Sequence, residues 1–401
     1  MVSADRSGHA LSFYKRSEQM EANTQKQQAY RSFCPPVRRL MGPGPSDIHP
    51  RVMHALSQPT IGHLDPEFIR LMDEVKALTQ YAFQTQNQLT MVVSAPGSAG
   101  MEAAFVNLVE PGDKVIVCRN GVFGGRMLEN VQRCGGIPVV LDDPWGCPVD
   151  PNKVKEALDA HPDARVLAFV HAETSTGARS DAETLSGLAR ERGCYTIADT
   201  VTSLAGVPVY TDAWGLDAVY SGSQKCLSCV PGLSPVTFSA RAVEKIRGRK
   251  TKVQSWFLDL NLVMQYWGDG QARRSYHHTA PVNALYAMHE ALLMLQEEGL
   301  AQSWKRHAEQ HRRLKVGLEA LGFSFLVEEN WRLPQLNAVF LPEYVRDEAQ
   351  LRRRLLDEFN LEVGAGLGDL SGKIWRIGLM GHTAHPENVD FLLEALSELL
   401  H

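Results

Sequence analysis

The stretch VLAFVHAETSTGARSDAETLSGLARERGCYTIAD, residues 166–199, is the part of the chain that decides the fold. The apolar run at residues 166–170 predicts a strand, residues 182–192 have the apolar spacing of a helix, and residues 195–198 predict a second strand. Two short apolar strands joined by an amphipathic helix are typical of a parallel strand pair with its crossover. This stretch therefore predicts an α/β fold.

The same alternation continues on both sides of this unit. Further strands are expected at residues 89–93, 114–118, 137–141 and 236–239, and further helices at residues 101–109, 123–134 and 154–161. Such a pattern indicates a largely parallel sheet that is covered by helices on both faces. After about residue 280 the pattern changes to two long helices, at residues 282–296 and 300–321, followed by shorter strands and helices. We expect a flexible N-terminal extension at residues 1–40, a large domain at residues 41–280 and a small α+β domain at residues 281–401.

Composition excludes several classes of function. The chain has 401 residues, 22% charged residues and a net charge of −5 with both signs interspersed, so neither a nucleic-acid footprint nor a basic membrane patch is expected. No apolar stretch has the length that a membrane span needs. Seven cysteines, an odd number scattered through apolar segments, favour a reducing compartment. We therefore expect a cytoplasmic protein.

The first 39 residues differ from the rest because they are rich in Lys, Arg, Ser and Gln and poor in acids. We interpret them as a flexible tail, or as an over-long start with Met20 as the initiator. A mitochondrial presequence is the second interpretation. The C-terminal residues SELLH are not a peroxisomal signal.

Two reactive groups follow the ends of predicted strands. Lys225 closes the segment YSGSQK (residues 220–225), and Asp199 closes the strand at residues 195–198. Ligands of open α/β sheets bind beyond the carboxyl ends of the strands, which is where both groups fall. An amine that can form a Schiff base and an acid that keeps a pyridine nitrogen protonated are the requirements of pyridoxal 5′-phosphate (PLP). We therefore predict PLP held covalently on Lys225.

Three further segments could contact such a cofactor. The turn Gly97-Ser98-Ala99 opens a predicted helix directly after a strand, so its backbone amides can bind a phosphate. Phe123 begins the next predicted helix, where an aromatic ring can stack on a planar ring or simply join the core. Ser175 lies in a hydroxyl-rich turn after a strand, where it can bind the phenolic oxygen of the cofactor or a substrate group. No metal site is predicted from the spacing of ligands.

Arg376 lies between apolar residues in a predicted strand of the C-terminal part. Two interpretations are open. It is either an exposed strand arginine or the anchor of a substrate carboxylate, for which the rigid guanidinium fork is suited.

Short motifs in register relate the chain to a known family. They are MGPGPS (41–46), EPGD (110–113), ETSTG (173–177), SGSQK (221–225), RKTK (249–252), YHHT (276–279), GAGLG (364–368) and RIG (376–378). With these motifs the chain resembles the class V, fold type I PLP-dependent aminotransferases, and among them the alanine–glyoxylate (serine–pyruvate) branch. The resemblance covers roughly nine tenths of the chain, from Met41 to the C-terminus.

The resemblance implies a large domain with a mostly parallel seven-stranded sheet between helices, a smaller C-terminal α+β domain, and a homodimer. It implies that Lys225 carries PLP and moves the proton, and that Asp199 pairs with the ring nitrogen. Arg376, helped by the backbone around Gly42, would hold the substrate carboxylate. The further cofactor contacts that it implies are Gly97, Ser98, Val201, Ser203 and Gln224 within the chain, and Tyr276 and Thr279 from the neighbouring subunit. Phe123 stands where the family often has Trp.

The implied reaction is the transfer of an amino group from alanine, or serine, to glyoxylate. The alternatives are serine–glyoxylate and (S)-ureidoglycine–glyoxylate aminotransferase, because the segments 224–228 and 373–378 also resemble the ureidoglycine branch. His63 and the segment 255–259 differ from that branch and favour alanine or serine as the donor. A non-catalytic protein that kept the fold is a fourth interpretation, which requires Lys225, Asp199 and Arg376 to occur together by chance.

Overall fold

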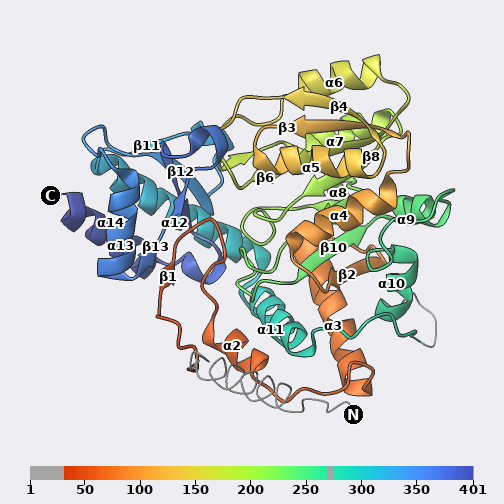
Figure 1. The fold of residues 1–401 in the computed structure, drawn as a ribbon, viewed down its shortest axis with the longest axis horizontal. Coiled ribbons are helices and arrows are strands. Elements are labelled where there is room, and N and C mark those ends of the chain that lie inside the picture. Colours follow the sequence, from red (N-terminus) through yellow and green to blue (C-terminus); the bar gives the residue numbers. More distant parts are fainter. Residues whose placement is uncertain (1–30, 269–273, 401) are drawn as a thin grey trace, which may run out of the picture. The chain divides into compact units, whose positions relative to one another are not determined.

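The computed structural model describes residues 31–268 and 274–400. A seven-stranded sheet with the strand order β2-β10-β9-β8-β5-β3-β4 is its main feature (Figure 1). The strands are β2 (Leu89–Val93), β3 (Lys114–Arg119), β4 (Ile137–Asp142), β5 (Ala164–Val170), β8 (Tyr195–Asp199), β9 (Ala218–Tyr220) and β10 (Ser234–Phe238). β10 runs antiparallel to β2 and β9, and the other neighbours are parallel. The predicted α/β fold with a mostly parallel seven-stranded sheet is confirmed.

Helices cover both faces of this sheet. Every residue of β2, β9 and β10 is buried, although successive side chains point to opposite faces. α4 and α5 contact each other and the sheet, and Figure 1 shows them side by side; α6 and α7 form a second contacting pair. The helices of this part are α2 (Pro50–Leu56), α3 (Pro66–Phe83), α4 (Gly97–Leu108), α5 (Val122–Arg133), α6 (Pro151–Ala160), α7 (Ala182–Glu191), α8 (Thr211–Trp214), α9 (Ala240–Arg247), α10 (Leu260–Trp267) and α11 (Val282–Glu298).

The way in which these helices begin differs between the two pairs. Asp150 accepts a hydrogen bond from the first turn of α6, and Asp181 does the same for α7, so their own N-cap side chains satisfy backbone donors. The N-cap residues of α4 and α5 are Pro96 and Gly121, and neither residue supplies a side-chain cap. The backbone donors at the starts of α4 and α5 therefore need partners from elsewhere.

The C-terminal part contains a four-stranded antiparallel sheet with the order β11-β12-β15-β14. Short strands β1 and β13 pair in parallel, and β6 and β7 form a small antiparallel pair. The elements are β1 (Arg39–Leu40), β6 (Ala172–Glu173), β7 (Ala178–Arg179), α12 (Leu300–Ala320), β11 (Ser324–Phe325), β12 (Leu336–Phe340), α13 (Glu348–Phe359), β13 (Leu361–Glu362), β14 (Gly364–Ala365), β15 (Ile374–Gly378) and α14 (Pro386–Leu400), with 3₁₀ turns η1 (Glu329–Trp331), η2 (Gly368–Leu370) and η3 (Gly381–Thr383).

The described residues form two hydrophobic cores. The first surrounds the large sheet and includes α11. The second is built by α12, α13, α14 and the small sheet around Trp375, and it includes Met41 from the early part of the chain. The division at residue 280 stays a prediction, and α11 packs on α2 and α3 rather than on the second core.

Two segments of the C-terminal part form only short strands. Within residues 323–327 the strand β11 is limited to Ser324–Phe325. Residues 361–365 are divided into β13 and β14, because β13 pairs with β1 whereas β14 pairs with β15. The periodicity of one segment cannot reveal that its two halves have different partners.

The predicted N-terminal extension lies mostly outside the described residues, and with it the predictions of a flexible tail and of a presequence. Residues 31–37 have no regular secondary structure. Among the residues that the structure describes, no helix combines the length and apolar character that crossing a bilayer demands.

Candidate active site

Asp199 and Tyr220 end neighbouring parallel strands and face each other across them. The register of β8 and β9 pairs the two residues, and the Tyr220 hydroxyl donates to Asp199 Oδ2 at 2.8 Å. The backbone amide of Val201 donates to the other carboxylate oxygen at 2.9 Å. Burial raises the pKa of Asp199 to about 7, against these hydrogen bonds, which lower it. The hydrogen bonds therefore hold the carboxyl group in a fixed position. A cationic partner next to it would lower its pKa toward the ordinary value.

Lys225 follows β9 in a buried loop and is only 8% exposed. Its ammonium donates to the carbonyl of Pro43. Within the described residues no carboxylate forms a salt bridge with it. Burial, and after it the positive charge of Arg376, lower the pKa of Lys225 to about 8. This amine is consequently far easier to deprotonate than a surface lysine, which is what a nucleophilic lysine requires.

The loop that contains Gly42 and Gly44 closes over Lys225. Gly44 has a φ of +113°, and a Cβ on it would collide with Lys225 Nζ, so both its backbone conformation and its contact require glycine. Gly42 in turn packs against Gly378 of β15, where a Cβ would meet the Gly42 carbonyl. Ser46 fastens the loop, because its hydroxyl donates to the carbonyl of Lys225 at 2.7 Å.

Arg376 lies in β15 with its guanidinium directed to the same region. Nε donates to the carbonyl of Ala365 at 2.8 Å and Nη1 to that of Thr174 at 3.2 Å. In the described part of the chain no carboxylate lies within salt-bridge distance of it. Burial lowers the pKa of Arg376 to about 10, and the charge of Glu173 opposes this. The expectation of an exposed strand arginine is wrong, because the side chain is buried and held by two backbone carbonyls.

The start of α4 supplies the candidate phosphate site. Gly97 is buried against the carbonyl of Ser221 and the side chain of Val201, each 3.4 Å from the position of a Cβ. Ser98 is exposed at this end of the helix, and the amide of Ala99 donates to the carbonyl of Pro96 at 2.7 Å, so this amide is already used.

Gln224 contributes a buried amide oxygen that has no hydrogen-bond partner within the described structure. The side chain lies against Gly222, whose Cβ position is 2.8 Å from Oε1. The unpaired atom is an acceptor, so a ligand that donates a hydrogen bond would complete it. A phosphate oxygen could be bound only through the NH₂ group of the same side chain.

Phe123 and Ser175 meet at the start of α5. The Arg126 guanidinium lies 4.7 Å from the centre of the partly buried Phe123 ring. The hydroxyl of Ser175 accepts from the amide of Val122 at 3.0 Å and donates to Glu173 at 2.5 Å. The predicted bond from Ser175 to the cofactor would have to compete with these two interactions.

Thr174 was missed by sequence reasoning. Its carbonyl binds Arg376, and its hydroxyl lies 2.5 Å from that of Thr202. The ETSTG motif contains three hydroxyl residues, and their spacing alone does not show which one faces the site. Ser203 is buried, and its hydroxyl lies 3.0 Å from Nδ1 of His171.

The chemistry of these residues fits PLP. A buried carboxyl group that forms no salt bridge in the described residues suits the ring nitrogen, a buried amine suits the aldehyde, and a helix start without a side-chain cap suits the phosphate. Among the described residues, no group of three or more possible ligands could hold a metal ion.

The Aminotransferase class-V family matches residues 45–373. The chain belongs to this family. The alanine–glyoxylate aminotransferase of Rattus norvegicus is 40% identical over 366 residues, which are 91% of this chain and 88% of that protein. The crystal structure of an alanine–glyoxylate aminotransferase from Nostoc sp. superposes with a TM-score of 0.91 and 47% identity, covering 94% of this chain and 99% of the other. A ureidoglycine–glyoxylate aminotransferase from Bacillus subtilis gives a TM-score of 0.89 and 33% identity, covering 92% and 94%. The protein is an enzyme of the aminotransferase class, a family whose fold implies PLP.

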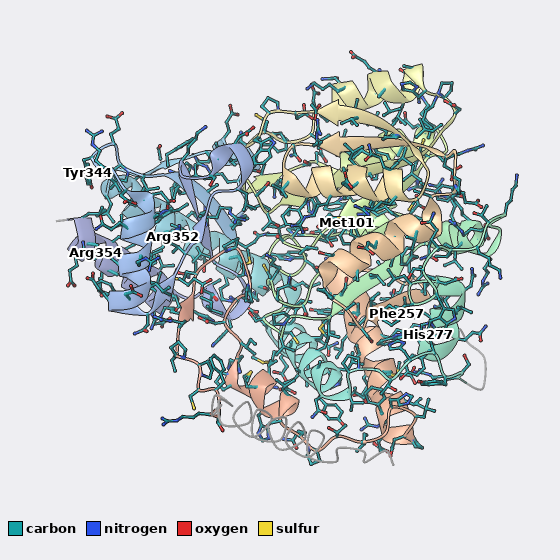
Figure 2. All side chains as sticks on the ribbon, in the orientation of Figure 1. Met101, Phe257, His277, Tyr344, Arg352 and Arg354 are labelled. Atoms are coloured by element: carbon teal, nitrogen blue, oxygen red, sulfur yellow. The ribbon has the colours of Figure 1, made fainter. Side chains whose placement is uncertain are left out.

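In this class-V aminotransferase the two residues expected to act across a dimer are on the surface of the chain. Tyr276 is 63% exposed and Thr279 is also exposed. The His277 ring between them stacks on Trp256 with centroids 4.4 Å apart, and Phe257 lies beside it (Figure 2). His63 lies 5.3 Å from the Tyr276 ring, measured between centroids. His63 and the segment 255–259, which the resemblance sets apart from the ureidoglycine branch, therefore contact the segment that contains Tyr276.

Proposed function

We propose that this enzyme transfers the amino group of a small amino acid, alanine or serine, to glyoxylate. The products are glycine and pyruvate, or glycine and hydroxypyruvate, so that atoms balance in each pair of substrates and products. The observation that carries the proposal is the buried Arg376, whose positive charge helps to lower the pKa of Lys225. An amine and a carboxylate anchor that face one site are suited to an α-amino acid.

Each residue has a defined task in this proposal. PLP bound covalently on Lys225 would supply an electron-accepting ring that stabilises negative charge at the substrate α-carbon. Asp199, positioned by Tyr220 and the amide of Val201, would keep the ring nitrogen protonated. Once substrate has displaced it, the Lys225 amine would take the proton from the substrate α-carbon. It would then deliver this proton to the cofactor carbon that receives the amino group. This task needs a neutral amine, which burial favours.

The substrate end of the site is formed by Arg376 and the loop around Gly42. The guanidinium keeps N–H donors beyond those bonded to Ala365 and Thr174, and these would hold the carboxylate in a bidentate pair. The same contacts would serve the amino donor and then glyoxylate, because both substrates carry a carboxylate next to the reacting carbon.

The test of the reaction is a glyoxylate-dependent assay with alanine, serine and (S)-ureidoglycine, in which glycine is measured. We expect alanine or serine to give the highest kcat/KM. Higher kcat/KM with ureidoglycine would assign the enzyme to the alternative function. Borohydride reduction followed by peptide mapping should place the label on Lys225, and a label elsewhere would refute the proposed attachment.

We also propose a homodimer in which Tyr276 and Thr279 complete the phosphate site of the partner. Their exposure supports this arrangement. Mixing subunits with Lys225→Ala and subunits with Tyr276→Ala tests it, since a mixed dimer would then hold one intact site. Recovery of about a quarter of the wild-type activity is expected after random reassociation of the two variants. No recovery would show that Tyr276 acts within its own subunit.

A further inference from the structure

Glu173 is a buried carboxylate to which the proposed reaction assigns no task. It ends β6 and has no exposed surface. Within the described residues it forms no salt bridge. Burial raises the pKa of Glu173, while hydrogen bonds from Ser175 and from the backbone of Gly124 and Phe123 lower it. A buried acid without a salt bridge is costly, so its retention calls for a structural or functional reason.

The geometry shows what Glu173 does for α5. This helix has no cap from its own N-cap residue, Gly121. Instead the amide of Val122 donates to Ser175 Oγ at 3.0 Å and the amide of Phe123 donates to Glu173 Oε2 at 3.2 Å. Two side chains from a separate turn thus satisfy the first backbone donors of the helix, and the negative charge lies at the positive end of its dipole.

Gly121 allows this arrangement. A Cβ at position 121 would overlap with the carboxylate group of Glu173 and with the hydroxyl of Ser175. The turn that presents both side chains is itself fixed, because the amide of Gly177 donates to the carbonyl of Glu173 at 2.8 Å. The start of α5 is therefore held against the 173–177 turn by direct contact.

The same turn also touches the rest of the site. Thr174, the next residue, gives its carbonyl to Arg376, and the charge of Glu173 acts on both Arg376 and Asp199. Glu173 is thereby connected to three residues of the site. They are Phe123, which is expected to stack on the cofactor ring, Arg376, which is expected to hold the substrate, and Asp199, which is expected to pair with the ring nitrogen.

We propose that Glu173 is a positioning residue that caps α5 from outside the helix, and that it thereby holds Phe123 in place for the cofactor ring. The proposal rests on the proposed binding of PLP at Lys225. It predicts that loss of the cap weakens PLP binding even when the apoenzyme stays folded, because the start of α5 must then become ordered when the cofactor binds.

The experiment compares PLP affinity of apoenzymes at 25 °C, by titration of the cofactor absorption, with thermal unfolding of the same proteins. Glu173→Gln keeps the shape of the side chain and removes its charge. Glu183→Gln is the matched control, because Glu183 is an exposed acid in the first turn of α7. We expect the Kd for PLP to rise about tenfold in Glu173→Gln, because its NH₂ group cannot accept from a backbone amide and the negative charge at the start of α5 is lost, and to stay unchanged in the control. The absorption and circular dichroism bands of the bound cofactor should change as well, which a purely structural role would not produce.

A folded Glu173→Gln apoenzyme that binds PLP as tightly as the wild type would overturn the proposal. If Glu173→Gln does not fold, Gly121→Ala provides the second test, since its Cβ would displace the side chains of both Glu173 and Ser175 from the start of α5. Gly121→Ala must then weaken PLP binding, and an unchanged Kd would equally overturn the proposal. Failure of the wild type to bind PLP at Lys225 would instead refute the proposed function, so the two failures can be told apart.

Discussion

Replacement of Arg376 is the most direct test of the proposed substrate site. The guanidinium is buried and uses Nε and Nη1 on the carbonyls of Ala365 and Thr174, which fixes the plane of the fork. Arg376→Gln removes the charge and the fork. Arg376→Lys keeps the charge but loses the paired geometry, and the two variants therefore separate charge from shape.

The expected magnitude follows from the bonds that a carboxylate would make. Two charge-assisted hydrogen bonds contribute about 1.5–3 kcal/mol each, or about 3–6 kcal/mol together. At 1.4 kcal/mol per factor of ten, Arg376→Gln should lower kcat/KM for the amino donor by about 10²–10⁴-fold. Arg376→Lys should lower it less, by about 10–10²-fold, because an ammonium retains the attraction without the fork.

The assay is steady-state kinetics with alanine and glyoxylate, with alaninamide as a donor that lacks the anionic carboxylate. Alaninamide should react with wild type and variants at similar kcat/KM, since it has no carboxylate for the arginine to hold. Arg312→Lys, on the exposed side of α12, serves as the control. The reasoning fails if folded Arg376→Gln retains wild-type kcat/KM for alanine, or if it loses activity equally toward alaninamide.

Three further outcomes follow from the site. Attachment of PLP to the apoenzyme needs a neutral amine, so its rate should rise with pH through about 8, where burial has brought the pKa of Lys225; a rate that still climbs steeply above pH 10 would contradict this. Burial raises the pKa of Asp199 in the folded apoenzyme to about 7, so the free energy of unfolding should fall as pH rises from about 4 through 7. Asp199→Asn should remove this loss in denaturant titrations and should lower activity by about 10²-fold or more. Parallel curves of stability against pH for the two proteins would argue against this role of Asp199. Gly44→Ala should abolish covalent PLP as measured by mass spectrometry, because its Cβ would collide with Lys225. Gly112 has a φ of +86° and open space at its Cβ position, so Gly112→Ala is a control that introduces backbone strain only. Equal PLP occupancy in the two variants would refute the steric argument.

The alternating strands and helices of the large sheet could be predicted from the sequence because its buried strands are continuous apolar runs. Lys225, Asp199 and Arg376 could also be selected, since each is a polar group at the end of, or within, such a run. The structure places all three in one buried region, linked through the effects of Asp199 and Arg376 on the pKa of Lys225. Their catalytic roles remain predictions until the variants are measured.

Tyr220 and Glu173 could not be recognised in the same way. Tyr220 donates to Asp199 only because the register of β8 and β9 sets the two residues side by side, and register depends on pairing between distant segments. Glu173 appears in the sequence only as one member of the ETSTG motif. The contact that explains it joins residue 173 to the start of a helix some fifty residues earlier in the chain. Neither relation is contained in local periodicity.

The energetics of the four buried charges support a ligand of mixed charge. Lys225 and Arg376 are cations, Asp199 and Glu173 are acids, and within the described residues none of them forms a salt bridge with another. Burial shifts the pKa of every one of them toward its neutral form. Stability alone would favour either tight pairs or apolar replacements, because an uncompensated buried charge costs several kcal/mol by an order-of-magnitude estimate. A cofactor with a cationic ring nitrogen and an aldehyde, together with a substrate carboxylate, would match Asp199, Lys225 and Arg376, whereas Glu173 is matched by the backbone amides at the start of α5. The separation of the charges is therefore better explained by binding and proton transfer than by folding.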